Sequence, residues 1–248
     1  MGQHWYRKDE VTGGVEACHF MGKDGRATTL REGRKYKLTP SVTSIGGVKY
    51  RFGLEQWKIE TAVRYALTQP DGRDVKEVVK EAFEELDKQA QDGTDIHAIL
   101  EAWATGEPFD QKYIHMCVEV YDLIMENTGL DIDDFEVETR FCDTVHGYAG
   151  MCDLHNEHWI IDYKSKDTVD EKTKGWPEQA EQLAAYAHGL GYPNARLANI
   201  FISRADPTQL VWYEHKDPLE AWERFRHTLM LWQVENKYGP YYETLHKL

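Results

Sequence analysis

The feature that most constrains the fold is a change in hydrophobic period near Phe135. Before that point apolar residues recur at helical spacing, most clearly from Asp74 to about Trp103. After it, apolar and polar residues alternate in short runs, which is the period of a β-strand. A chain of 248 residues that carries both patterns is long enough for one large α/β domain or two small ones.

The first half of the chain is predicted to be mostly helical. Up to about Thr39 the sequence is rich in Gly, Thr and charge, and we expect hairpins and loops there. The stretch T-P-S-V-T-S that follows predicts a turn with Ser or Thr available as a helix cap. Helices are predicted over Leu54–Leu67, Asp74–Trp103 and Tyr113–Asn127.

The second half predicts a sheet with helices packed on it. Strands are expected over 135–142, 148–155, 158–165, 195–204 and 210–216, with helices over 176–190 and 218–234. This order predicts an α/β core with a central mixed sheet flanked by helices, and an N-terminal helical cap or arch over it. We expect a single domain, 1–248, in which 1–110 form the arm and cap and 111–248 form the core.

Composition excludes several classes of protein. There is no run of about 18 uncharged apolar residues, so no membrane span is expected. The first ten residues are polar and lack the apolar segment of a signal peptide. The four cysteines, Cys18, Cys117, Cys142 and Cys152, have no metal-site spacing. They are typical of free thiols in a reducing compartment, so we expect a cytoplasmic protein.

Charge is distributed unevenly along the chain. The net charge is −14, which argues against a polyanionic partner. However, Lys23–Arg51 contains eight basic and two acidic residues, a net charge of +6 that leaves −20 for the rest. A basic arm on an acidic body can hold a phosphate backbone locally, and a solvated polar loop accounts for the charges equally well.

Three consecutive predicted strands each carry a carboxylate, namely Glu138, Asp153 and Asp162. In an extended chain Ile160, Asp162 and Lys164 share one face. Clustered carboxylates repel one another and raise each other's pKa unless a cation lies among them. Oxygen ligands of this kind suit Mg²⁺ or Mn²⁺. A cluster of structural ion pairs is the weaker alternative.

Two predicted helices carry polar residues at four-residue spacing. Gly93, His97 and Glu101 lie on one face of the first, and Gln182 and Tyr186 on one stripe of the second. Each set alone is equally typical of solvent-facing positions.

Taken in chain order, these residues resemble the RecB-type branch of the PD-(D/E)XK nuclease superfamily. The motifs are G-x-x-x-H-x-x-x-E at 93–101, a Glu at 138, G-x-x-D at 150–153, I-D-Y-K at 161–164 and Q-x-x-x-Y at 182–186. The Pro-Asp of the family name is Cys152-Asp153 here. H-W-Y at 4–6 and T-P-S-V-T-S-I at 39–45 also look like phage-encoded and mitochondrial genome-maintenance exonucleases of this branch.

The resemblance implies a restriction-endonuclease-like core and a role for each matching residue. Asp153, Asp162, the carbonyl of Tyr163 and His97 would hold Mg²⁺ or Mn²⁺. Glu138 would orient the attacking water or hold a second ion, and Lys164 would position or activate that water. Gln182 and Tyr186 would order Lys164 and the scissile strand. Some relatives hold an iron–sulphur cluster through one Cys before the His and three near the C-terminus, but no Cys follows Cys152 here, so no such cluster is expected.

The function expected on this basis is metal-dependent hydrolysis of DNA from its ends, in phage or bacterial recombination or repair. DNA is the expected partner, with a single-strand annealing or recombination protein as a second. Arg31, Arg34 and Lys35 of the basic arm are expected to contact phosphates. The alternatives are an endonuclease of the same fold, of restriction or junction-resolving type, and a catalytically idle nucleic-acid-binding module.

Overall fold

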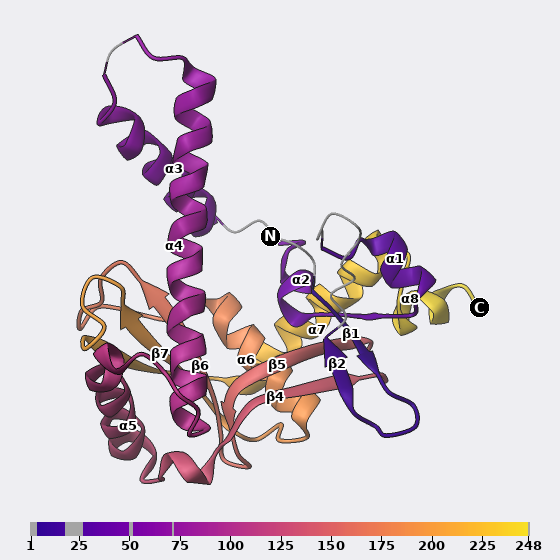
Figure 1. Cartoon of the computed structure of the whole chain (residues 1–248). Helices are drawn as coiled ribbons and strands as arrows, with labels where there is room; N and C mark the ends of the chain where they lie inside the picture. Colours follow the sequence, from indigo (N-terminus) through magenta and orange to yellow (C-terminus); the bar gives the residue numbers. More distant parts are fainter. Residues whose placement is uncertain (1–3, 18–26, 50–51, 71, 248) are drawn as a thin grey trace.

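The computed structural model describes residues 4–17, 27–49, 52–70 and 72–247. It is a mixed α/β structure in which helices flank a five-stranded mixed sheet (Figure 1). Among the described residues, no helix combines the length and the apolar character that crossing a membrane requires.

The sheet confirms the strands expected from the alternating pattern. Its order is β4-β5-β6-β7-β8, in which β6 and β7 are parallel and the other neighbours are antiparallel. The strands are β4 Glu136–Asp143, β5 Tyr148–His155, β6 Trp159–Lys166, β7 Arg196–Ser203 and β8 Leu210–His215. The parallel pair needs a crossover connection, which α6 (Pro177–Leu190) supplies.

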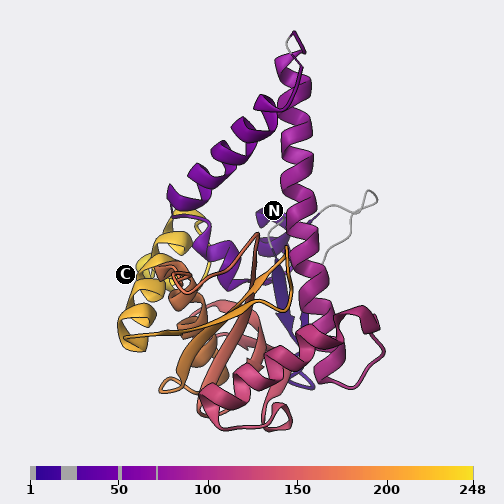
Figure 2. The same ribbon diagram turned by 90° about the vertical axis from the view of Figure 1, so that its left-hand side faces the viewer.

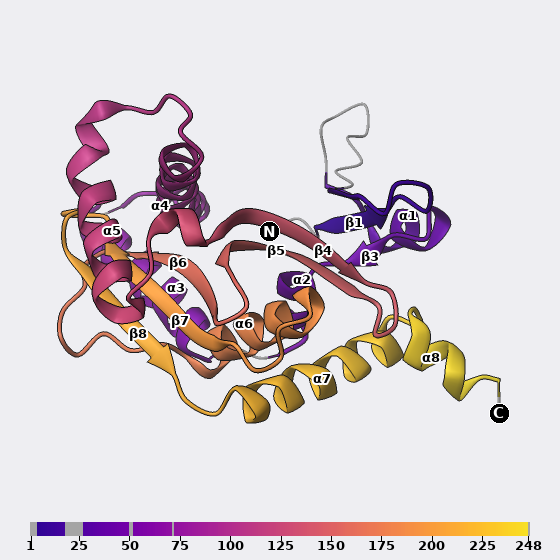
Figure 3. The same ribbon diagram turned by 90° about the horizontal axis from the view of Figure 1, so that it is seen from below.

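Helices cover both faces of the sheet (Figure 3), and the alternating side chains of the strands are buried in two clusters. Two helices, α6 and α7 (Pro218–Glu235), pack on the face to which Ile160 points. On the other face, α5 (Ile114–Thr128) and the C-terminal part of α4 (Val75–Ala104) pack against Ile161 and Tyr163. The predicted alternation along β6 is therefore confirmed.

The N-terminal segment forms a small sheet and two short helices. These elements are β1 Trp5–Lys8, β2 Val15–Ala17, α1 Leu30–Lys35, β3 Thr39–Pro40 and α2 Val42–Gly46. Ser41 caps α2 by accepting a hydrogen bond from the main-chain N–H of Ser44, which confirms the predicted cap. Trp5 is buried against Trp232 of α7, so the H-W-Y stretch contributes to the core.

The helices α3 (Phe52–Leu67) and α4 form an antiparallel hairpin, of which only the C-terminal part of α4 lies against the sheet. In Figures 1 and 2 the rest of the hairpin extends away from the sheet, so the predicted cap or arch is not confirmed. Short elements complete the chain, namely η1 Gln111–Tyr113, η2 Ile132–Asp134 and α8 Pro240–Leu245.

Candidate functional site

The sheet opens into a fork between β5 and β6. These strands pair only at Leu154–Ile161 and at His155–Ile160. Beyond that point β5 continues beside β4, and β6 continues beside β7. The next residue on each separating strand is an aspartate, Asp153 on β5 and Asp162 on β6, so the sheet topology brings two of the predicted carboxylates to the mouth of the fork.

The carboxylate of Asp162 is buried and held from three sides. Its Oδ2 atom lies 2.5 Å from Nζ of Lys164 and 2.8 Å from Nδ2 of Asn199, and its Oδ1 atom lies 3.2 Å from Nε2 of Gln182. Burial raises the pKa of Asp162, and the charge of Lys164 opposes that rise without cancelling it. Asp162 and Lys164, which were predicted to share one face of the strand, therefore form an ion pair, with Lys164 the more exposed partner.

The predicted Gln–Tyr stripe of α6 also reaches this site. Nε2 of Gln182 donates to the hydroxyl oxygen of Tyr186 at 2.8 Å, as well as to Asp162. Tyr186 is buried, and burial raises the pKa of its hydroxyl well above the ordinary value. The amide of Gln182 is thus tied at two points, and one of them is a carboxylate oxygen of the site.

His97 approaches Asp153 from α4, on the opposite face of the sheet. Its Nδ1 atom lies 3.3 Å from Oδ2 of Asp153, and its ring packs edge-on against the ring of Tyr163. Burial works to lower the pKa of His97, but the hydrogen bond and charge of Asp153, together with the charge of Asp162, raise it overall. Gly93 was predicted to share a face of this helix with His97. It lies in a part of α4 whose side chains are outside the described residues.

Glu138 lies across from Asp153 in a strained conformation. In the β4–β5 ladder Val137 pairs with Leu154 and Thr139 with Cys152, which places Glu138 opposite Asp153. Its φ of 50° is rare for a residue with a side chain and is costly within a strand. Burial, followed by the charges of Asp153 and Glu101, raises the pKa of Glu138 to about 7. The third predicted carboxylate therefore belongs to the same cluster.

The carboxylates at the fork are the type of ligand that a hard divalent cation prefers. Two buried carboxylates and a third with a raised pKa are the groups that a cation would stabilise in their charged form. In the described part of the chain, no three His, Cys, Asp or Glu side chains form a ready-made metal site. Instead Lys164, Asn199 and Gln182 engage the oxygens of Asp162, and the N–H of Tyr163 engages Asp153.

The basic residues Arg31, Arg34 and Lys35 are not brought to the fork. They lie on α1, which is at the opposite end of the molecule from α4 (Figures 1 and 3). The guanidinium of Arg34 donates to the main-chain carbonyl of Asn236. Contact of these three residues with DNA stays a prediction. Three further members of the basic segment, Lys23, Arg26 and Arg51, lie outside the described residues.

Two polar residues of the site were not expected from the sequence. Asn199 on β7 and His215 on β8 are buried behind Asp162 and hydrogen-bonded to each other. One signal could have revealed Asn199, because an amide within the apolar run L-A-N-I-F-I needs a buried partner. His215 ends a strand that alternates ordinarily, and its pattern indicates nothing unusual.

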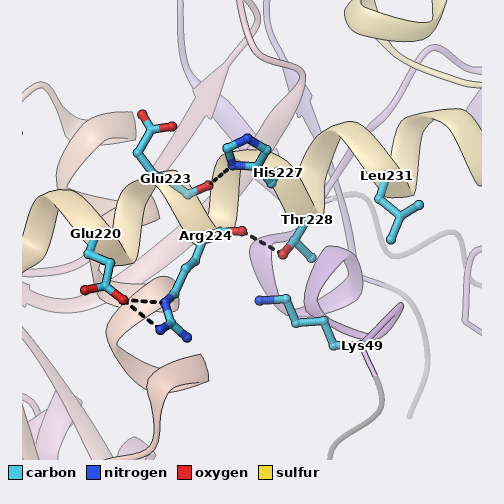
Figure 4. A pocket seen from close by; sticks show the side chains of 7 residues that line it. All are labelled: Lys49, Glu220, Glu223, Arg224, His227, Thr228 and Leu231. Atoms are coloured by element: carbon cyan, nitrogen blue, oxygen red, sulfur yellow. Dashed lines mark hydrogen bonds and ion pairs between the residues drawn. The ribbon is translucent and has the colours of Figure 1, made fainter.

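A separate cavity of about 490 Å³ lies along α7 (Figure 4). Most of its polar groups are already engaged. Arg224 pairs with Glu220, Nδ1 of His227 contacts the carbonyl of Glu223, and Lys49 pairs with Glu181 of α6. None of the three carboxylates of the fork lines it, so this cavity and the fork are separate features of the structure.

Comparisons with known proteins add little. No family model matches the chain, and no curated protein matches it. A solved structure titled "Crystal structure of SSO0001" is similar with a TM-score of 0.33 and 12% identity, over 74% of this chain and 88% of that chain. Similarity at this level carries no conclusion about function.

Proposed function

We propose that this protein is a metal-dependent deoxyribonuclease of the RecB-type PD-(D/E)XK kind that hydrolyses DNA from its ends. The observation that carries the proposal is the arrangement around Asp162. Its buried carboxylate is paired with Lys164 of the same strand and hydrogen-bonded by Gln182, while Asp153 lies on the adjacent strand of the fork. An ion-pair cluster built only for stability has no need of a strained third carboxylate, Glu138, beside it.

The residues that would hold Mg²⁺ or Mn²⁺ are Asp153, Asp162, the carbonyl of Tyr163 and His97. When bound, such an ion supplies Lewis acidity toward a phosphoryl oxygen and lowers the pKa of water. The chain supplies burial, which strengthens charge interactions at the fork. Nδ1 of His97 already lies close to Asp153, so the face of the sheet covered by α4 also contributes to the site.

Lys164 is the residue placed to act on the reacting groups. Its ammonium is held against Asp162 at 2.5 Å, while its side chain remains about a quarter exposed. It can therefore orient a water molecule and offset the negative charge that develops on the phosphoryl group. Glu138, with a pKa of about 7, can accept a proton from a nearby water near neutral pH.

We expect DNA to reach the fork past two basic side chains at the ends of β6 and β7. Lys166 follows on β6 with its ammonium 4.4 Å from the centre of the Phe201 ring, and Arg204 follows β7 and reaches Ser165 at 3.2 Å. Arg204 also forms an ion pair with Asp167. We expect Lys166, and Arg204 where a phosphate replaces Asp167, to engage DNA in spite of the overall charge of −14. Polarity and strand preference do not follow from this arrangement.

Cleavage assays on matched DNA substrates test the proposal. End-labelled linear DNA and covalently closed circles would be incubated with the purified protein and Mg²⁺ or Mn²⁺, with EDTA and Asp162→Ala as controls. We expect linear DNA to be degraded, closed circles to be spared, and both controls to be inactive. Efficient cutting of closed circles would overturn the exonuclease proposal in favour of an endonuclease of the same fold. Binding of DNA without cleavage under all of these conditions would favour the idle binding module.

A further inference from the structure

The amide of Asn199 is fully buried and gives both of its hydrogens to one residue. One hydrogen bond goes to the main-chain carbonyl of Asp162 at 3.0 Å, and the other goes to its carboxylate Oδ2 at 2.8 Å. An amide used in this way has only its Oδ1 oxygen left for a further partner. That partner is Nε2 of His215, 2.7 Å away, so Nε2 of His215 must be the donor.

The ring of His215 is held in place on its outer side. Burial lowers the pKa of His215 to about 4, so the ring is neutral near pH 7, with its proton on Nε2. A Cβ atom at Gly175 would lie 2.4 Å from Cε1 of His215, so only glycine leaves room for the ring there. The ring also borders a cavity of about 240 Å³ at the start of α6.

We propose that Asn199 and His215 are positioning residues, which fix the orientation of the Asp162 carboxylate toward the divalent cation. This inference rests on the proposed function, because it assigns to Asp162 the role of a metal ligand. Lys164 and Gln182 reach the carboxylate from side chains that are partly open to solvent. Asn199 reaches it from the interior and ties the same residue's main chain to its side chain, so Asn199 sets the angle of the carboxylate.

The alternative is that Asn199 only satisfies buried polar groups. Both roles predict that Asn199→Ala lowers thermal stability, so stability alone does not separate them. Only a positioning role predicts weaker binding of the ion, because outer partners of metal ligands typically change metal affinity by about 10–100-fold. The amide of Gln233 offers a matched control. It is equally buried and has two main-chain partners, the carbonyl of His146 and the N–H of Tyr241, but no contact with Asp162.

The experiment is a calorimetric titration of Mn²⁺ into wild type, Asn199→Ala, Gln233→Ala and Asp162→Ala, with melting temperatures recorded alongside. We expect Asn199→Ala to weaken Mn²⁺ binding by about 10-fold or more, and Gln233→Ala to bind like wild type at a comparable loss of melting temperature. On DNA, Asn199→Ala should lower kcat and leave KM unchanged. Equal Mn²⁺ affinity in Asn199→Ala and wild type would overturn the positioning role while leaving the proposed function intact. A wild type that neither binds Mn²⁺ nor cleaves DNA would overturn both.

A second pair of variants keeps the inference falsifiable if Asn199→Ala does not fold. His215→Gln retains a donor for Oδ1 of Asn199, whereas His215→Phe fills similar space without one. We expect His215→Phe to weaken Mn²⁺ binding and His215→Gln to restore it in part. Identical Mn²⁺ affinity in these two variants would contradict the role of the His215 hydrogen bond.

Discussion

The main-chain N–H of Tyr163 donates a hydrogen bond to Oδ2 of Asp153, 2.8 Å away, at the point where β5 and β6 have separated. A side-chain carboxylate thus accepts a main-chain N–H of β6 at the place where the β5–β6 ladder stops. The same oxygen also faces Nδ1 of His97. Asp153 therefore has two roles, since it completes the main-chain pairing at the fork and also belongs to the proposed metal site.

These two roles of Asp153 can be separated by substitution. Asp153→Asn keeps an oxygen acceptor for the N–H of Tyr163 and removes the charge, so we expect a stable protein without nuclease activity. Asp153→Ala also leaves that buried N–H without a partner, which costs about 1–3 kcal/mol. Urea unfolding and a cleavage assay on linear DNA measure the two effects. Wild-type cleavage by Asp153→Asn would show that Asp153 is not a metal ligand.

Lys164 is expected to contribute to turnover rather than to metal affinity. Its ammonium lies 2.5 Å from Oδ2 of Asp162, an oxygen that would otherwise be open to an ion. Lys164→Met, which keeps the length of the side chain, should therefore bind Mn²⁺ as well as wild type or better. Its kcat should fall by about 10²–10⁴-fold, the usual contribution of a residue that assists proton transfer. Lost Mn²⁺ affinity in calorimetry would instead give Lys164 a structural role.

Glu138 makes stability depend on pH in a defined window. Its pKa rises from 4.5 to about 7 because of burial first, and then because of the charges of Asp153 and Glu101. In the unfolded chain Glu138 ionises near pH 4.5, but in the folded protein it does so only near pH 7, so folding stability falls as pH rises between these values. Glu138→Gln should remove this fall, and its advantage over wild type should grow from pH 4.5 to 7 and then level off. Denaturant unfolding in EDTA measures the difference, and a constant difference across this range would contradict the assignment.

Much of the fold could be predicted because the hydrophobic period is strong where burial is complete. The strand β5 begins and ends where its alternation predicts, and β6 to within one residue. The short helix α1 was expected to be loop, since its six residues are too few for a periodic pattern to emerge. Its start was nevertheless marked, because Thr29 and Glu32 form a capping box whose spacing is visible in the sequence.

The charged residues of the candidate site could be predicted from the sequence, whereas the backbone conformation and buried contacts that hold them in place could not. Asp153, Asp162 and Lys164 could be placed together because strand alternation fixes their faces. The positive φ of Glu138 and the neutral ring of His215 depend on tertiary packing, which no local pattern encodes. Placing α1 required knowledge of how the N-terminal segment packs. The charge of this segment suggested that it lies near the site, but the structure places α1, the helix that carries Arg31, at the other end of the molecule.

Because α1 lies far from the fork, we expect its predicted phosphate contacts to form only with long DNA. If the proposed site is correct, we expect a substrate that fills only the fork not to reach α1, whereas long DNA that runs along the molecule would. Replacing Arg31, Arg34 and Lys35 with Ala should therefore leave cleavage of a short oligonucleotide unchanged. For long DNA it should flatten the dependence of log affinity on log salt by up to ~3 units, at about 0.7–0.9 per phosphate contact.

The matched control for the triple α1 variant removes three positive charges at a different place in the protein. Lys76, Lys80 and Lys112 are exposed on α4 and η1, so their triple alanine variant changes the net charge by the same amount at another place. Fluorescence anisotropy across a salt series measures both variants on short and long DNA. We expect the slope for long DNA to change with the α1 residues and not with the control, because contact depends on position and not on net charge. An unchanged slope for the α1 variant would mean that long DNA leaves the fork in another direction, for example past Lys166 and Arg204.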